Sequence, residues 1–103
     1  MKQKYQAAKI VFPDGAFIIV PIEVVEKSRA SYYKDIDHTT MNESLEDTRT
    51  TFNTCPEEIE NWILNNMDLE ELSREHNWTN RDSRKSYSDY KKLFGEAEVK
   101  PLT

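Results

Sequence analysis

The first hydrophobic pattern in the chain is a pair of β-rich runs separated by a turn. Residues 5–12 and 16–20 are rich in aromatic and aliphatic side chains, and Pro13-Asp14-Gly15 lies between them. Proline fixes φ, aspartate bonds back to the backbone, and glycine accepts a positive φ, so this tripeptide favours a tight turn. The pattern predicts an N-terminal β-hairpin.

Helical periodicity follows the hairpin directly. Pro21 suits the first turn of a helix, where its missing N–H costs nothing. We expect a helix over residues 22–34 and a loop over residues 35–40. Asn42 is a candidate cap for a short helix that ends near Phe52.

The clearest helical stripe lies in residues 56–72. Its apolar side chains recur at i, i+3, i+4 and i+8, namely Ile59, Trp62, Ile63 and Met67. We assign Trp62 to the core because it lies on this stripe. Pro56 fits the first turn and Thr54 the cap, and the helix should end around residues 65–66. Asp68 can then cap a further short helix.

The composition shifts after Trp78. Residues 79–86 are polar and are typical of a linker. A last amphipathic helix is predicted from the spacing of Tyr87, Tyr90, Leu93 and Phe94. Gly95 should stop this helix, and residues 97–99 fit a short strand or a tail.

These elements predict an α+β fold, with an N-terminal β-hairpin followed by four to five short helices, the last loosely attached. We expect a compact domain over residues 1–78 and a basic, aromatic C-terminal helix and tail over residues 79–103. A lone hairpin is marginal in water. Helices on one of its faces, a third strand from near the C-terminus, or a second copy of the chain would each complete it. We favour helices on one face, with a homodimer as the alternative.

Composition narrows the class of protein. A chain of 103 residues suffices for one small core, and its eleven aromatic residues are too many for a wholly disordered chain. No apolar run approaches the roughly 20 residues of a membrane span. The N-terminus has no apolar signal core. Cys55, the single cysteine, cannot form an internal disulfide, so a reducing cytoplasm is the simplest setting.

The net charge of −5 is unevenly distributed. Residues 1–55 carry −1, residues 56–76 carry −6, and residues 77–103 carry +2. Phosphate contact requires concentrated lysine and arginine. The acidic segment therefore argues against nucleic-acid binding by the body of the domain.

Three spaced segments resemble a known group of proteins. They are Arg29-Ala30-Ser31-Tyr32-Tyr33, Ser44-Leu45-Glu46-Asp47-Thr48, and Trp62-Ile63-Leu64-Asn65-Asn66-Met67. In this order they resemble small proteins of tailed bacteriophages that carry R-A-x-Y-Y, S-L-x-E-D-T and W-x-x-N-N-M elements, although the second segment here lacks the x position. The resemblance spans residues 17–72. Leu69 replaces the aromatic residue usual after Asn-Asn-Met-Asp.

The resemblance brings no established reaction. It implies a phage-encoded protein in the cytoplasm of a bacterial host, and proteins of that class often bind a host or phage protein. We therefore expect a binding protein without enzymatic activity, metal or cofactor. The predicted contact surface consists of Tyr32, Tyr33, Glu57, Glu60, Glu70 and Glu71. Consecutive helical residues point about 100° apart, so Tyr32 and Tyr33 can hardly both be buried in one thin domain.

The sequence contains only weak candidates for metal-binding or catalytic residues. Asp35, Asp37 and His38 supply fewer oxygen ligands than a calcium loop requires, and zinc normally needs three or four Cys, His or carboxylate ligands. We therefore interpret them as part of a solvated loop. His76 lies in a polar segment without a partner motif. Cys55 precedes a helix start, where the dipole favours a thiolate, but no motif links it to a base. A small residue at a capping position is the simpler interpretation.

Two other functions fit parts of the chain. Basic and aromatic residues alternate in the last helix, which is typical of nucleic-acid contact. They are Arg81, Arg84, Lys85, Tyr87, Tyr90, Lys91, Lys92 and Phe94. The same basic residues would also be explained if this helix docked on the acidic segment of the protein. Alternatively, the acidic helix could act as a DNA-mimic inhibitor, although such mimics usually carry a higher charge density.

Overall fold

The structure, a computed structural model, describes residues 3–74 and 77–103. Its strands are β1 (Ala7–Val11), β2 (Phe17–Pro21), β3 (Trp78–Thr79) and β4 (Glu98–Leu102). Its helices are α1 (Ile22–Asp37), α2 (Met41–Thr54), α3 (Glu57–Asn66), α4 (Leu69–Leu72) and α5 (Tyr87–Leu93), with a 3-10 turn at Phe94–Glu96. The predicted α+β class and N-terminal hairpin are confirmed.

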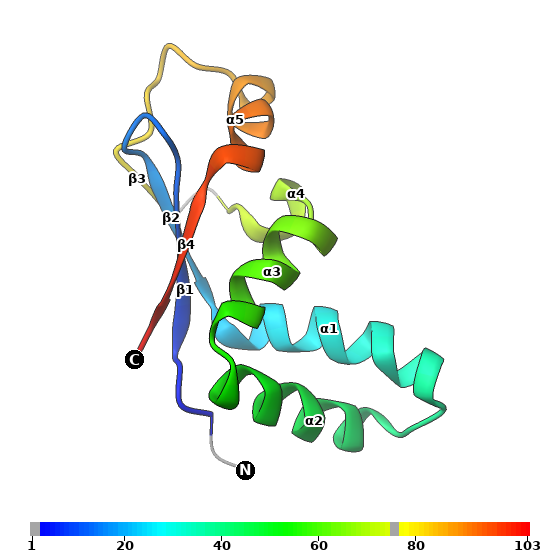
Figure 1. Cartoon of the computed structure of the whole chain (residues 1–103). Helices are drawn as coiled ribbons and strands as arrows, with labels where there is room; N and C mark the ends of the chain where they lie inside the picture. The colour runs from blue at the N-terminus through cyan, green and yellow to red at the C-terminus, as the bar shows by residue number, and fades with distance from the viewer. Residues whose placement is uncertain (1–2, 75–76) are drawn as a thin grey trace.

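The two ends of the sequence meet in one antiparallel sheet. The strand order is β3-β2-β1-β4, and in its centre Ile10 lies opposite Ile18 on one side and Val99 on the other. Side chains alternate between the two faces of a strand. One face is buried, and all helices lie on that side (Figure 1). The sheet thus combines helices on one face with a strand from near the C-terminus.

Helix α3 lies across the buried face of the sheet and supplies the centre of the core. Its apolar stripe is buried, including Ile59, Ile63 and Trp62, as the periodicity predicted. Met67, just after the helix, is buried as well. The core assignment of Trp62 is therefore confirmed.

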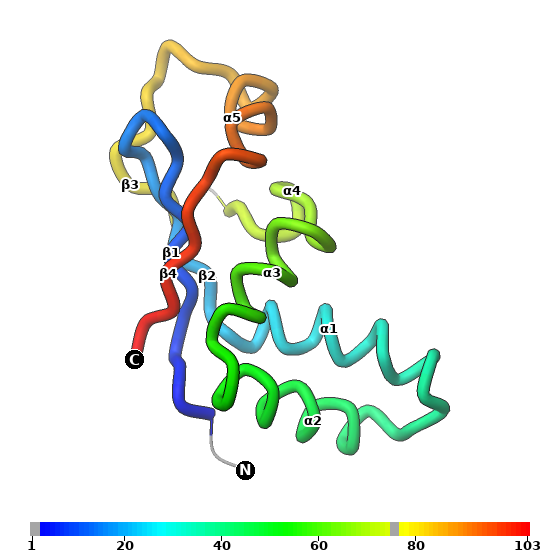
Figure 2. The backbone as a smooth tube through the Cα atoms, viewed as in Figure 1, coloured from blue at the N-terminus to red at the C-terminus, as the bar shows by residue number. Residues whose placement is uncertain are grey.

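Helices α1 and α2 form an antiparallel hairpin that extends away from the sheet (Figure 2). Polar groups hold them together. The buried Glu26 carboxylate accepts a hydrogen bond from Arg49 Nε at 2.8 Å and one from Gln3 Nε2 at 3.0 Å. Ser44 Oγ donates to the Ala30 carbonyl at 2.7 Å. Since each buried polar group has a partner, the seam does not incur the cost of an unsatisfied one.

Several predicted boundaries need correction. Helix α1 continues to Asp37 and ends at His38, whose left-handed φ of 54° breaks the helix. Thr40, and not Asn42, caps α2, because Glu43 N–H donates to Thr40 Oγ1 at 3.2 Å. Thr54 is the last residue of α2 and makes no cap for α3. Asp68 does precede α4 as its cap residue.

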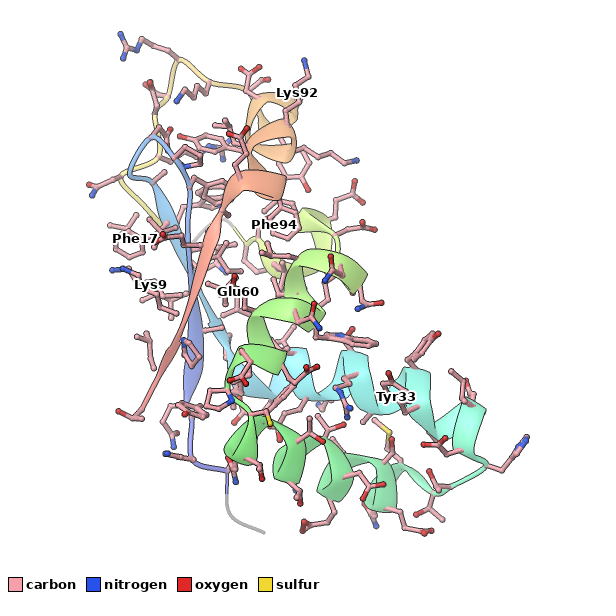
Figure 3. The ribbon with its side chains drawn as sticks, in the orientation of Figure 1. Lys9, Phe17, Tyr33, Glu60, Lys92 and Phe94 are labelled. Carbon is pink, nitrogen blue, oxygen red and sulfur yellow. The ribbon has the colours of Figure 1, made fainter. Side chains whose placement is uncertain are left out.

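The loose attachment expected for the last helix is also corrected. Tyr90 of α5 is completely buried, and Phe94 packs in the same core (Figure 3). The segment expected as a linker begins in β3 and folds back through a turn in which Lys85 N–H donates to the Asp82 carbonyl. Of residues 97–99, the last two prove to be the start of β4, which pairs with the whole of β1. Residues 79–103 therefore complete the core formed by residues before them.

Asp14, in the hairpin turn, binds this C-terminal segment. Tyr90 Oη donates to Asp14 Oδ2 at 2.8 Å, and Lys85 Nζ reaches the same oxygen at 2.8 Å. Asp14 Oδ1 also accepts from the Ala16 N–H at 3.0 Å. Burial by itself would raise the pKa of Asp14, but the hydrogen bonds from Lys85, Ala16 and Tyr90 together lower that pKa to about 2.

The two tyrosines of α5 provide a matched stability test. Tyr90 Oη donates to Asp14 and accepts from the Asp82 N–H at 2.7 Å, whereas Tyr87 Oη is buried without a hydrogen-bond partner among the described residues. We expect Tyr90→Phe to lower the free energy of unfolding by about 1.5–3 kcal/mol, because it breaks a bond to a charged group. Tyr87→Phe should leave it unchanged or raise it. Urea denaturation of both variants measures the difference, and equal losses would contradict this account.

The Asp14 contacts also predict a pH dependence. A carboxylate whose pKa is lower in the folded state stabilises that state above its unfolded pKa, and the contribution disappears as the pH falls. The free-energy difference between the wild type and Asp14→Asn should therefore be constant near neutrality. It should shrink between about pH 4 and pH 2, the window set by the ordinary value and the folded value of about 2. Urea titrations across that range measure it, and a difference independent of pH would refute the assignment.

Candidate functional site

Tyr32 and Tyr33 do come together, in an aromatic cluster with Trp62. The Tyr32 and Tyr33 rings meet edge to face with centroids 5.1 Å apart, and they lie 5.6 Å and 5.9 Å from Trp62. Tyr32 is 53% exposed, while Tyr33 packs against the core. The arrangement matches the expectation that the two consecutive helical tyrosines are not both buried.

The cluster is held by polar contacts that orient its rings. Trp62 Nε1 donates to Ser28 Oγ at 3.0 Å, which ties α3 to α1. The Arg29 guanidinium lies 4.6 Å from the Tyr33 ring centroid and donates to Thr48 Oγ1 at 3.1 Å. These contacts fix the rings of Tyr33 and Trp62 against which Tyr32 packs. Tyr32 therefore offers contact area at a low cost in conformational entropy.

The outer face of α3 is acidic. A groove of about 640 Å³ is lined by Glu57, Glu58, Glu60, Asn61, Leu64, Asn65 and Gly95. Figure 3 labels Glu60 on this helix. Within residues 3–74 and 77–103, none of the three glutamates has a cationic partner within 4 Å. By contrast, the carboxylates of Asp14 and Glu26 are both ion-paired.

The acidic face and the aromatic cluster are neighbours on the surface of α3. Glu58 and Asn65 are one helical turn from Trp62, so they lie beside it on the helix. Glu58, Asn61 and Asn65 were not among the predicted contact residues. The 3.6-residue period that placed Glu57 and Glu60 outside would also have placed them there.

Glu70 and Glu71 do not belong to this face. Glu70 Oε1 lies 3.5 Å from Lys91 Nζ of α5, so its charge is partly compensated within the chain. Glu71 Oε1 accepts from the Asp68 N–H at 3.2 Å and caps α4. Glu71 also lines a separate groove of about 440 Å³ with Ile19, Val20, Pro21, Val24, Leu72, Arg74 and Asn77.

Other candidate residues take up structural positions. Asp35 and Asp37 end α1 and are exposed, as is His38. No group of three or more His, Cys, Asp or Glu residues is placed to hold a metal within the described part of the chain. The Cys55 carbonyl accepts from the Glu58 N–H at 2.9 Å and so joins α2 to α3. His76 lies outside the described residues.

The basic, aromatic segment is used largely inside the molecule. Tyr90 and Phe94 are buried, and Tyr87 packs against the core. Arg84 pairs with Asp82 at 3.1 Å, and Lys85 pairs with Asp14 at 2.8 Å. The Lys91–Glu70 pair agrees with docking of α5 on the acidic segment. The aromatic rings are therefore unavailable as a stacking platform for bases.

Comparison of the chain with models of protein families, with curated proteins and with solved structures finds no match to any of them. Among the helices of the described residues, none has both the length and the apolar character that crossing a membrane requires.

Neutralising a carboxylate should change the free energy of unfolding much more in α1 than in α3. Glu26→Gln removes the charged partner of Arg49 in a buried seam, and we expect it to cost about 2–4 kcal/mol of unfolding free energy. Glu60→Gln changes an exposed residue without a cationic partner and should stay within about 0.5 kcal/mol of the wild type. Chemical denaturation compares the two. A large loss for Glu60→Gln would mean that this carboxylate supports the fold.

Proposed function

We propose that this chain is a phage-encoded, non-enzymatic binding protein that modulates a host or phage protein. Its contact surface is the outer face of α3 together with Tyr32 and Tyr33. One observation carries the proposal, namely that Glu57, Glu58 and Glu60 line a groove without cationic partners among the described residues. The resemblance of residues 17–72 to small phage proteins supports the class of function.

Electrostatics supports a basic partner. The three carboxylates along the groove of α3 create a negative potential that attracts and orients lysine and arginine side chains. Such rim charges act mainly on the rate of association. The aromatic cluster beside them supplies the apolar area that gives a contact its affinity. A protein surface with basic residues around an apolar pocket is the complement of this arrangement.

The separation of Glu70 and Glu71 from this face reduces the predicted contact set. Glu57, Glu60, Tyr32 and Tyr33 stay in the proposal, and Glu58 joins them. Glu70 serves the docking of α5 and Glu71 the cap of α4. Nucleic-acid binding through the tail has less support, because Tyr90 and Phe94 are buried.

The proposal is tested by charge reversal on one face of α3. Tagged wild type, the double variant Glu57→Lys with Glu60→Lys, and the single variant Glu98→Lys are used to capture proteins from a bacterial lysate. Glu98 is an exposed carboxylate on β4, a strand that packs against α3, but its side chain lies on the sheet face opposite to the buried Val99. We expect a partner that the wild type and Glu98→Lys retain and that the double variant loses. Binding of the purified partner should weaken at least tenfold in the double variant, and salt should weaken it further in the wild type.

The same purified partner separates simple binding from imitation of DNA. If the partner binds DNA and an oligonucleotide competes with the wild-type chain for it, the acidic face acts as a DNA mimic. Tyr33→Ala should weaken binding in either case, since it removes one ring of the aromatic cluster that belongs to the proposed contact surface. Equal capture by the wild type and by both glutamate variants would overturn the proposed surface.

A further inference from the structure

Large hydrophobic side chains are well exposed at two separate places in the described part of the chain. Ile19 is 40% exposed on the sheet, and Tyr32 and Ile36 are each 53% exposed on α1. Single exposed hydrophobic residues are normal. These three lie within larger surfaces, however, and the neighbouring charges of the two surfaces are opposite in sign.

The first surface is the face of the sheet that no helix covers, which we call the open sheet face. It consists of Ala7, Lys9, Val11, Phe17, Ile19, Pro21, Glu98, Lys100 and Leu102. In its central row Lys9 lies between Ile19 and Lys100. The Lys9 ammonium is 4.2 Å from the Phe17 ring centroid (Figure 3). The open sheet face is therefore apolar with two lysines at its centre and one carboxylate, Glu98, at its end.

The second surface is the exposed end of α1, which we call the α1 ridge. Tyr32 and Ile36 are four residues apart and so lie on one side of the helix. Asp35 and Asp37 flank Ile36, and Lys34 forms only an exposed pair with Asp35, at 3.8 Å. The α1 ridge lies at the far end of the helical hairpin, away from the sheet (Figure 1). It is therefore apolar with an acidic margin, and it projects from the body.

We propose that the α1 ridge of one copy docks on the open sheet face of a second copy. Apolar groups would then cover Ile19 and Phe17, and Asp35 and Asp37 would approach Lys9 and Lys100. A helix packed on a sheet face is the arrangement that already covers the other side of this sheet. Pairing between two open sheet faces is less favourable, because Lys9 and Lys100 of one copy would approach the lysines of the other and repel them.

This contact joins two different surfaces, so a pair of molecules keeps one free ridge and one free face. Such heterologous contacts continue into a ring or a filament. A helix end on a three-row sheet face buries less than a standard interface, so the association is weak and depends on concentration. It does not use the carboxylates of α3, and Tyr32 is the one residue that it shares with the proposed binding surface.

The test uses two variants that each remove one surface. Ile19→Glu blocks the open sheet face, and Tyr32→Gln with Ile36→Gln blocks the α1 ridge. All three positions are exposed, so circular dichroism should show native folding. Sedimentation velocity from micromolar to millimolar concentration should show growing assemblies for the wild type. Each variant alone should remain monomeric.

Mixing the two variants provides the decisive measurement. The intact ridge of one can dock on the intact face of the other, but neither can extend further. The mixture should therefore form a one-to-one dimer and stop there. A monomeric wild type at millimolar concentration would overturn the inference. So would a two-fold dimer of the wild type that is unaffected by both variants, or a mixture that stays monomeric.

Discussion

The pairing of β4 with β1 is the constraint on which the rest of the structure depends. It brings residues 98–102 beside residues 7–11, so the last part of the chain closes the sheet that the first part begins. Tyr90 and Phe94 then enter the same core as Ile10 and Ile18. The contacts of Asp14 with Tyr90 and Lys85 fix this closure at the hairpin turn. Contacts between distant parts of a chain are made against the entropy of loop closure, so these bonds matter for stability.

The carboxylates of the protein fall into two groups according to their partners. Asp14 and Glu26 are held by cations and hydrogen bonds, and they join elements that are far apart in the sequence. Glu57, Glu58 and Glu60 lie on the outside of α3 and have no such cations in the described residues. The first group supports the fold, while the second leaves its charge available. This division is the physical basis for the binding surface that we propose on α3.

The helical layer and the open sheet face have different surface chemistry. The first offers carboxylates beside supported aromatic rings, and the second offers lysines among apolar side chains. In our two proposals, the helical layer binds a basic partner, and the open sheet face receives the α1 ridge of a second copy. The two proposed contacts share Tyr32 but otherwise use different residues, so a change at Glu57 and Glu60, or a change at Ile19, removes one contact without the other.

Local patterns in the sequence determined the hairpin, the helices and the buried stripe of α3, because turn chemistry and the 3.6-residue period act over a few residues. They also placed Glu57 and Glu60 outside and Trp62 inside. Only the tertiary structure decided that Glu70 pairs with Lys91 and that Tyr90 bonds to Asp14. It likewise decided that residues 98–102 form an edge strand and that Ile19 stays on an uncovered face. Those outcomes depend on which distant segments meet, and no local pattern encodes that meeting.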